Sequence, residues 1–143
     1  MRAMAKTVQV TFDCGDPHAV ARFWAAALGY EKEDHSSFVE DLLTSGTMEP
    51  ESTVICDGGR QFADVSACRD PEGKGPRFYF QRVPEPKTSK NRVHLDLHVG
   101  PDQYEREAAR LEQLGARRLW YSEDRGAKCW TMADVEGNEF CVD

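Results

Sequence analysis

The chain has 143 residues, of which 40% are hydrophobic and 30% charged, and its net charge at pH 7 is −7. This length allows one globular domain with a buried core, and the acidic charge argues against nucleic acid or an anionic membrane surface as a partner. No apolar run has the length of a membrane span or a signal peptide. The five cysteines include no C-x-x-C pair, which favours a reducing cytoplasm over a disulfide framework.

The chain begins with a predicted strand that recurs later in the sequence. Residues Val8–Gly15 (VQVTFDCG) align with Val93–Gly100 (VHLDLHVG). Apolar and polar residues alternate in both segments, which is the period of a half-buried strand. This repeat predicts two copies of one structural motif.

Each predicted strand leads into a predicted helix. The first helix spans residues 17–28, because Asp16 is a good N-cap, Pro17 suits the first turn and Gly29 can end the helix. The second helix opens at Pro101 and ends at Gly115. Apolar side chains recur at helical spacing in both segments, so each helix is expected to cover one face of its sheet.

Similar turns and strands follow in each copy. The turn Asp70–Gly73 resembles Asp134–Gly137, and each has a glycine at its end. Strands are predicted after these turns over residues 78–83 and 139–143, and before the second turn over residues 118–122 and 128–132. Each copy therefore has the order β-α-β-β-β.

The first copy also contains an extra segment. Ser37–Glu40 is a capping-box pattern that predicts a short helix, and Asp57–Gly59 predicts a hairpin turn. We expect one α+β domain over residues 1–143, with a first module at 7–83 that carries this insertion, a polar linker at 84–91 and a second module at 92–143. One helix cannot cover both faces of a small sheet, so the two modules should pair their sheets into a cup, within one chain or between two.

The duplicated motif resembles the vicinal oxygen chelate superfamily. The resemblance covers nearly the whole chain and is carried by the residues 12–18, 80–87, 91–97 and 136–142, which look most like its glyoxalase-like domain branch. That superfamily includes glyoxalase I, extradiol dioxygenases, fosfomycin-modifying enzymes and bleomycin-type drug-binding proteins. The resemblance implies a ligand site inside the cup, while the scaffold itself hosts unrelated activities.

Strand alternation predicts which side chains face into the cup. The helices need the apolar face of each strand, so the polar rows should point the other way. We expect Trp24 in the core, and His18 and His35 in solvent. The predicted ligand-binding set is Gln9, Thr11, Gln81, His94, Asp96, His98, Trp120, Trp130, Glu139 and Cys141.

The resemblance also implies where a metal ion would bind. Metal-using relatives take one ligand from the first and last strand of each module, which here gives the set Gln9, Gln81, His94 and Cys141, with Glu139 further back on the last strand. Hard divalent cations prefer carboxylate oxygen, and zinc normally takes three or four good protein ligands. The sequence therefore favours no cofactor, and a divalent metal is the alternative. A Cys141 nucleophile activated by His94 is a weaker idea, because no third orienting group is visible.

Two functions are compatible with these residues. The favoured hypothesis is a glyoxalase-like, metal-independent protein that binds a small aromatic or amphipathic molecule in the cup. The alternative is a metal-dependent lyase, isomerase or dioxygenase acting on vicinal oxygens. A protein-interaction module with a vestigial cup is a third, weaker hypothesis. No catalytic residue is identified. We also expect a homodimer, because closed two-fold dimers are the commonest small assembly.

Overall fold

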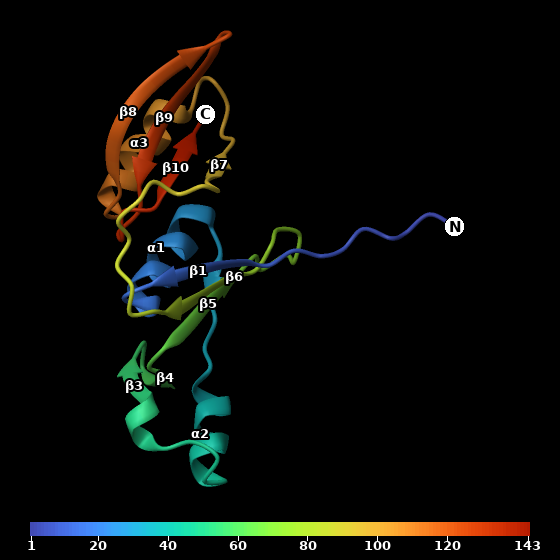
Figure 1. Ribbon diagram of the computed structural model, residues 1–143, viewed down its shortest axis with the longest axis vertical. Coiled ribbons are helices and arrows are strands. Elements are labelled where there is room, and N and C mark those ends of the chain that lie inside the picture. Colours follow the sequence, from blue (N-terminus) through green and yellow to red (C-terminus); the bar gives the residue numbers. More distant parts are fainter. The chain divides into compact units, whose positions relative to one another are not determined.

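The computed structural model describes residues 1–143 and divides into two compact units (Figure 1). Unit 1 comprises Met1–Pro84 and unit 2 comprises Glu85–Asp143. Each unit has its own mixed four-stranded sheet with one long helix, so the predicted α+β class is confirmed. None of the helices combines the length and the apolar character that crossing a membrane requires.

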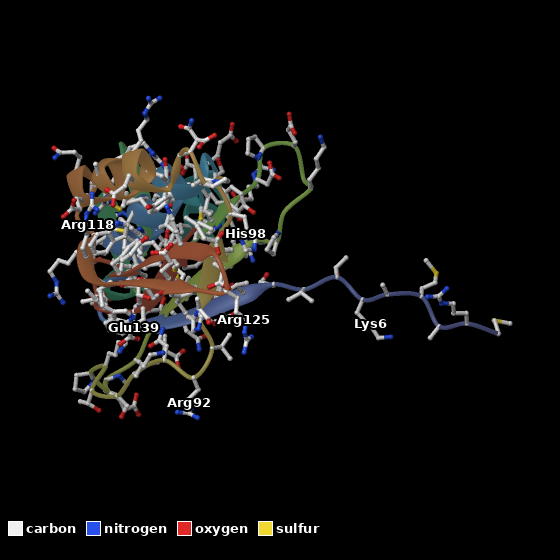
Figure 2. The ribbon with its side chains drawn as sticks, turned by 90° about the horizontal axis from the view of Figure 1, so that it is seen from above. Lys6, Arg92, His98, Arg118, Arg125 and Glu139 are labelled. Carbon is white, nitrogen blue, oxygen red and sulfur yellow. The ribbon has the colours of Figure 1, made fainter.

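Unit 1 is built around a sheet with the strand order β1-β6-β5-β2. Strand β1 pairs parallel with β6, and the other two pairings are antiparallel. Residues 1–9 precede the sheet as an extended segment that bears Lys6 (Figure 2). The strands are β1 (Val10–Cys14), β2 (Glu31–Lys32), β5 (Val65–Arg69) and β6 (Phe78–Arg82).

Helix α1 (Pro17–Leu28) has the bounds that the sequence predicts. The Asp16 carboxylate accepts a hydrogen bond from the Ala19 N–H at 3.2 Å, which satisfies one free donor of the first turn. Gly29 ends the helix with φ 70°, a left-handed conformation that favours glycine. Local capping chemistry is therefore sufficient to place this helix.

The core of unit 1 lies between α1 and the apolar face of its sheet. Trp24 of α1 is fully buried, and its ring centroid lies 5.6 Å from that of Phe12 and 5.7 Å from that of Phe78. Phe80 is also fully buried, at 5.4 Å from Phe12. The side chains of Thr11, Asp13 and Gln81 are exposed on the opposite face, as alternation predicts.

The insertion in unit 1 forms the predicted helix and hairpin. Helix α2 (Ser36–Thr44) is followed by the 3-10 turn η1 (Pro50–Ser52) and by strands β3 (Thr53–Cys56) and β4 (Gly59–Phe62). The expected capping box of Ser37 and Glu40 is wrong, because the helix begins at Ser36 with His35 at the N-cap, and the Asp34 carboxylate accepts from the Ser36 N–H at 2.9 Å. An aspartate two residues before a free N–H competes effectively for it.

Unit 2 repeats the arrangement with the strand order β7-β10-β9-β8. Its first and last strands, β7 (Leu95–Leu97) and β10 (Glu139–Val142), pair parallel, and β10-β9 and β9-β8 are antiparallel. Arg125 and Gly126 turn the chain at the tip of the hairpin with φ 52° and 82° (Figure 2). The other elements are α3 (Tyr104–Gln113), β8 (Arg117–Asp124) and β9 (Ala127–Ala133).

Helix α3 begins later than the sequence predicts. Pro101 does not open it, because Gly100–Gln103 forms a hydrogen-bonded turn first. Leu111 of α3 is fully buried, as are Met132 and Val142 of the sheet. The apolar face of the second sheet therefore packs on its helix, and His94, Asp96 and His98 are exposed on the other side.

Candidate functional site

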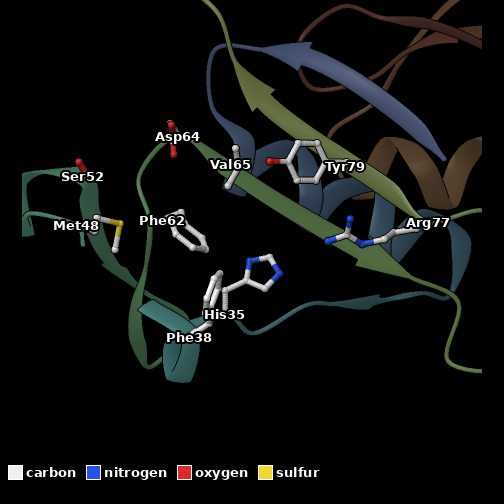
Figure 3. Close-up of a pocket in the computed structure, with 9 residues that line it drawn as sticks. All are labelled: His35, Phe38, Met48, Ser52, Phe62, Asp64, Val65, Arg77 and Tyr79. Carbon is white, nitrogen blue, oxygen red and sulfur yellow. The ribbon is translucent and has the colours of Figure 1, made fainter. Parts of the chain in front are cut away.

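A pocket of about 650 Å³ lies in unit 1 (Figure 3). One wall is the open face of the sheet, where Val65 of β5 and Tyr79 of β6 project. The insertion supplies the other wall through Phe38 of α2 and Phe62 of β4. This volume lies within the range of about 300–1,000 Å³ that is typical of small-molecule sites.

Aromatic rings make up the insertion side of this pocket. The ring centroid of Phe62 lies 5.8 Å from that of Phe38 and 5.8 Å from that of His35. Met48 adds a flexible thioether beside them. A planar or branched apolar group could therefore contact rings on one side and Tyr79 on the other.

A charged network lies at the other end of the pocket. The Arg77 guanidinium donates two hydrogen bonds to the Glu33 carboxylate, at 2.6 and 2.9 Å, and a third to the amide oxygen of Gln9 at 3.0 Å. It also lies over the Tyr79 ring, 5.4 Å from the centroid. The hydrogen bonds from Arg77 to the Glu33 carboxylate lower the pKa of Glu33. The Oε1 atom of Glu33 also lies 3.1 Å from His35 Nε2. The pocket thus has an aromatic wall and the ion pair of Arg77 and Glu33, and Asp64 also lines it.

Two buried polar side chains hold the insertion in place. Gln61 is 2% exposed, and its amide accepts from the His35 N–H at 3.0 Å and donates to Asp34 at 2.8 Å. His18 Nε2 donates to the Phe62 carbonyl at 2.7 Å. The expectation that His18 is solvent-exposed is wrong, since it is 7% exposed and burial lowers its pKa. A helix-surface pattern could not show that an insertion would cover it.

The hydrogen bonds to Asp34 predict its titration. Donation from Gln61, and then from Ser36, lowers the pKa of Asp34 from 3.8 to about 2. Because the pKa of Asp34 is lower in the folded state, its carboxylate stabilises the fold above pH 4. This contribution is lost as the pH falls towards 2. Carboxyl-carbon NMR should give a midpoint near 2 for Asp34, and Gln61→Leu should raise it towards 3.8. An ordinary midpoint in the unaltered protein would show that Gln61 does not hold this carboxylate.

Unit 2 brings three potential metal ligands together. One ligand atom from each of His94, Asp96 and Cys141 lies within 4.8 Å of the other two. The parallel register places Cys141 opposite Asp96, and His94 Nδ1 lies 3.1 Å from Asp96 Oδ1. Imidazole, carboxylate and thiolate are donors that zinc accepts, so these residues fit a borderline divalent ion better than a hard one.

The state of Cys141 argues against a role as a nucleophile. Burial, together with the neighbouring thiol of Cys129, raises the pKa of its thiol to about 11, so the group is protonated at neutral pH. A thiol attacks as the thiolate, which the neighbourhood of Cys141 disfavours.

The two glutamines of the predicted metal set lie in unit 1. Gln9 accepts from Arg77 beside the pocket, whereas Gln81 donates to Asp13 at 2.8 Å. Gln9 and Asp13 are four residues apart on an extended strand, roughly 13 Å, so the two amides do not converge. The register also pairs Thr11 with Tyr79, which makes Tyr79 rather than Gln81 the counterpart of Cys141 in the repeat.

The remaining predicted residues of unit 2 have separate environments. His98 Nδ1 lies 2.5 Å from Asp143, and Glu139 accepts from the Asn91 N–H and from Lys87. Trp120 is 46% exposed and pairs with Thr131 on the open face.

The expected position of Trp130 in the open row is wrong. Trp130 pairs with Val142 of the helix-facing row, and its indole donates to Glu105 of α3. Alternation assigns one row of each strand to each face, but which row of β9 faces the helix depends on its register with β10, which the sequence does not give.

The sequence hypothesis missed the pocket residues of the insertion. Phe38, Met48 and Phe62 have no counterpart in the second module, so the repeat could not identify them. Arg77 lies one residue before the predicted strand, so strand alternation does not identify it. A cluster of aromatic residues in an insertion next to a strand end was the available signal.

The fold agrees with the comparisons to known proteins. The family model for the glyoxalase-like domain matches residues 9–142, so the chain belongs to the glyoxalase-like domain family, within the vicinal oxygen chelate superfamily. No curated protein matches the sequence.

Several solved structures share the fold. The fosfomycin resistance protein FosX from Mesorhizobium loti has a TM-score of 0.63 at 12% identity, covering 98% of this chain and 91% of that one. A variant of FosX from Listeria monocytogenes, complexed with Mn(II) and a dihydroxypropylphosphonic acid, has a TM-score of 0.62 at 8% identity, with coverage of 98% and 90%. A glyoxalase/bleomycin resistance protein/dioxygenase family enzyme from Burkholderia phytofirmans has 0.61 at 13% identity, with 94% of each chain covered. Identities this low establish the fold alone.

Proposed function

We propose that this protein binds a small aromatic or amphipathic molecule in the pocket of unit 1, without a catalytic metal there. The observation that carries the proposal is the wall of Phe38, Phe62 and Tyr79 facing the charged network of Arg77 and Glu33. Small-molecule sites combine mostly apolar lining with a few placed polar groups. We also propose that the two sheets pair into a cup, that the protein is a homodimer and that it is cytoplasmic.

The charged network supports a narrower ligand class. Arg77 has five N–H groups, and three of them donate to Glu33 and Gln9, which leaves two for a ligand. Because Glu33 neutralises the guanidinium, a fully charged anion gains little there. A neutral molecule with an apolar ring and one hydrogen-bond acceptor fits this pocket best.

A fluorescence titration tests the proposal. Neutral N-phenylnaphthylamine should bind at one site per chain, and Phe62→Ala should weaken its affinity by about tenfold, because truncation removes ring contacts and leaves a wider pocket. Affinity is read from the increase in probe emission, and circular dichroism confirms that the variant is folded.

Ile55→Ala is the matched control for this experiment. Ile55 lies on the same hairpin but is 71% exposed and outside the pocket. We expect the Ile55→Ala variant to bind the probe with the same affinity as the unaltered protein. An equal loss in both variants, or no binding by the unaltered chain, would contradict the proposal.

The alternative function is a metal-dependent lyase, isomerase or dioxygenase. The cluster of His94, Asp96 and Cys141 supports it, as does the Mn(II) that accompanies FosX from Listeria monocytogenes. A bound ion would polarise substrate oxygens as a Lewis acid. Exposed His94 and Asp96 would hold it beside solvent, where a substrate could reach it.

A further inference from the structure

We infer that the pocket of unit 1 is a hydrolytic site, in which His35 acts as the general base for a water molecule that attacks a neutral aryl ester. The inference rests on the ligand pocket proposed above, and it names the substrate class and the reaction of that same site. The contacts of His35, Glu33 and Arg77 carry it, because they bring a base, an orienting carboxylate and a hydrogen-bond donor for an oxyanion together at one end of the pocket.

Glu33 fixes the proton of the neutral His35 ring on one nitrogen. Hydrogen bonds from Arg77 lower the pKa of Glu33, so its carboxylate is ionised and can only accept hydrogen bonds. Nε2 of His35 lies 3.1 Å from Glu33 Oε1 and therefore carries the proton. Nδ1 keeps its lone pair, and no group of the protein donates a hydrogen bond to it. A carboxylate orients a histidine in this way when the histidine serves as a general base.

His35 lies where a ligand in the pocket can reach its free nitrogen. Its side chain is 20% exposed, and Figure 3 shows the ring between the aromatic wall and Arg77. The ring centroid lies 5.8 Å from that of Phe62. Phe38 on the same wall is 56% exposed, so water can enter beside a bound ligand. The base, a water molecule and a ligand can therefore meet at this end of the pocket.

Arg77 can stabilise the negative charge that forms on the substrate carbonyl. Three of its five N–H groups donate to Glu33 and Gln9, and two remain for a ligand. Nη2 of Arg77 and Nε2 of His35 both contact Oε1 of Glu33, at 2.9 and 3.1 Å, which keeps the two nitrogens within the reach of one small substrate group. A carbonyl that accepts from Arg77 is thus held close to the base.

Charge balance selects a neutral ester over an anionic ligand. Glu33 already neutralises Arg77, so a preformed anion would leave surplus negative charge in the network. During hydrolysis, His35 gains a proton while the carbonyl oxygen becomes negative, and these two new charges compensate each other. The Glu33 carboxylate stabilises the imidazolium, and Arg77 stabilises the oxyanion. The carboxylate product is an anion that this network binds weakly, which favours its release.

The reaction consumes only the ester and water. The water oxygen bonds to the carbonyl carbon while its proton moves to Nδ1 of His35, and the π electron pair of the carbonyl moves onto its oxygen. The carbonyl then re-forms, the bond to the aryl oxygen breaks with its electron pair, and Nδ1 returns the proton to that oxygen. The products are a carboxylic acid and a phenol. The aryl group of the substrate suits the rings of Phe38 and Phe62.

Hydrolysis of neutral para-nitrophenyl butyrate by the full-length protein tests the inference. Release of nitrophenol should saturate with substrate, and N-phenylnaphthylamine should inhibit competitively with a constant equal to its dissociation constant in the fluorescence titration. His35→Gln keeps a donor for Glu33, and His35→Phe keeps a ring beside Phe62. Each should lower kcat by at least about 100-fold. KM should stay within about threefold in both variants, because the base acts in the transition state.

Glu33 is a positioning residue in this reaction, and its variant separates positioning from binding. Glu33→Gln should lower kcat by at least about tenfold, because the imidazole loses the carboxylate that orients it. The affinity for N-phenylnaphthylamine should stay within about twofold, since that probe is neutral. His98→Ala is the control for unspecific catalysis by an exposed imidazole. The His98 side chain is 76% exposed and lies in unit 2, so this variant should keep the kcat of the unaltered protein.

The outcomes distinguish this inference from the pocket proposal on which it rests. If the probe binds in the pocket but no saturable hydrolysis occurs, or either His35 variant keeps its kcat, the inference is overturned and the pocket stands. If the probe does not bind, both are overturned. A burst of nitrophenol equal to the protein concentration would show that a side chain is acylated, which would contradict direct attack by water.

Discussion

Replacing Phe80 with alanine should lower the free energy of unfolding by about 3–5 kcal/mol. Phe80 is fully buried in unit 1, where it packs 5.4 Å from Phe12 and 6.4 Å from Phe78, measured between ring centroids. The truncation would remove a whole ring from a packed aromatic cluster, which cannot collapse to fill the space. Urea denaturation followed by tryptophan fluorescence measures the loss, since Trp24 lies in the same core.

The neighbouring residue provides the control for this substitution. Gln81 follows Phe80 on β6 but is exposed on the opposite face. Gln81→Ala should change stability by less than about 0.5 kcal/mol, as is usual for a surface position. Equal losses in the two variants would mean that the faces of β6 are assigned incorrectly, and the pocket wall with them.

Replacing Glu33 with glutamine should convert the pocket into a site that prefers anions. The substitution removes the negative charge that accepts two hydrogen bonds from Arg77, while keeping a side chain of the same shape. An unneutralised guanidinium near the protein surface attracts an anion by up to a few kcal/mol before screening. We expect affinity for anionic anilinonaphthalene sulfonate to rise by about tenfold, measured by its emission.

The neutral probe shows whether the substitution acts through the charge of the pocket or through its shape. N-phenylnaphthylamine has a similar aromatic body without the sulfonate, so its affinity should stay within about twofold. High salt should reduce the gain for the anionic probe, because exposed charges are screened. Equal gains for both probes would indicate that Glu33→Gln loosens the pocket instead of changing its charge.

The fold could be predicted from the sequence because its signals are local or repeated. Helix α1 is bounded by the cap of Asp16 and the stop of Gly29, and alternation identifies the core row of each central strand. The start of α3 was less predictable, because the turn at Gly100–Gln103 depends on hydrogen bonds that Pro101 does not signal.

The candidate sites were harder to predict because they depend on register and on the insertion. Alternation places Asp96 on the open face, but its proximity to Cys141 follows from the parallel pairing of β7 and β10. Arg77 and Phe62 belong to segments far apart in the sequence, and only the folded insertion brings them to one pocket. Charge pairing between Glu33 and Arg77 was likewise not visible in either segment alone.

The most direct test of the central claim is an NMR titration of the isotope-labelled full-length protein with N-phenylnaphthylamine. We expect saturable shifts of backbone amides around Phe38, Phe62 and Tyr79 in unit 1, with the fitted affinity equal to that from fluorescence. Shifts confined to unit 2, or none at probe concentrations that saturate the fluorescence signal, would contradict binding in this pocket.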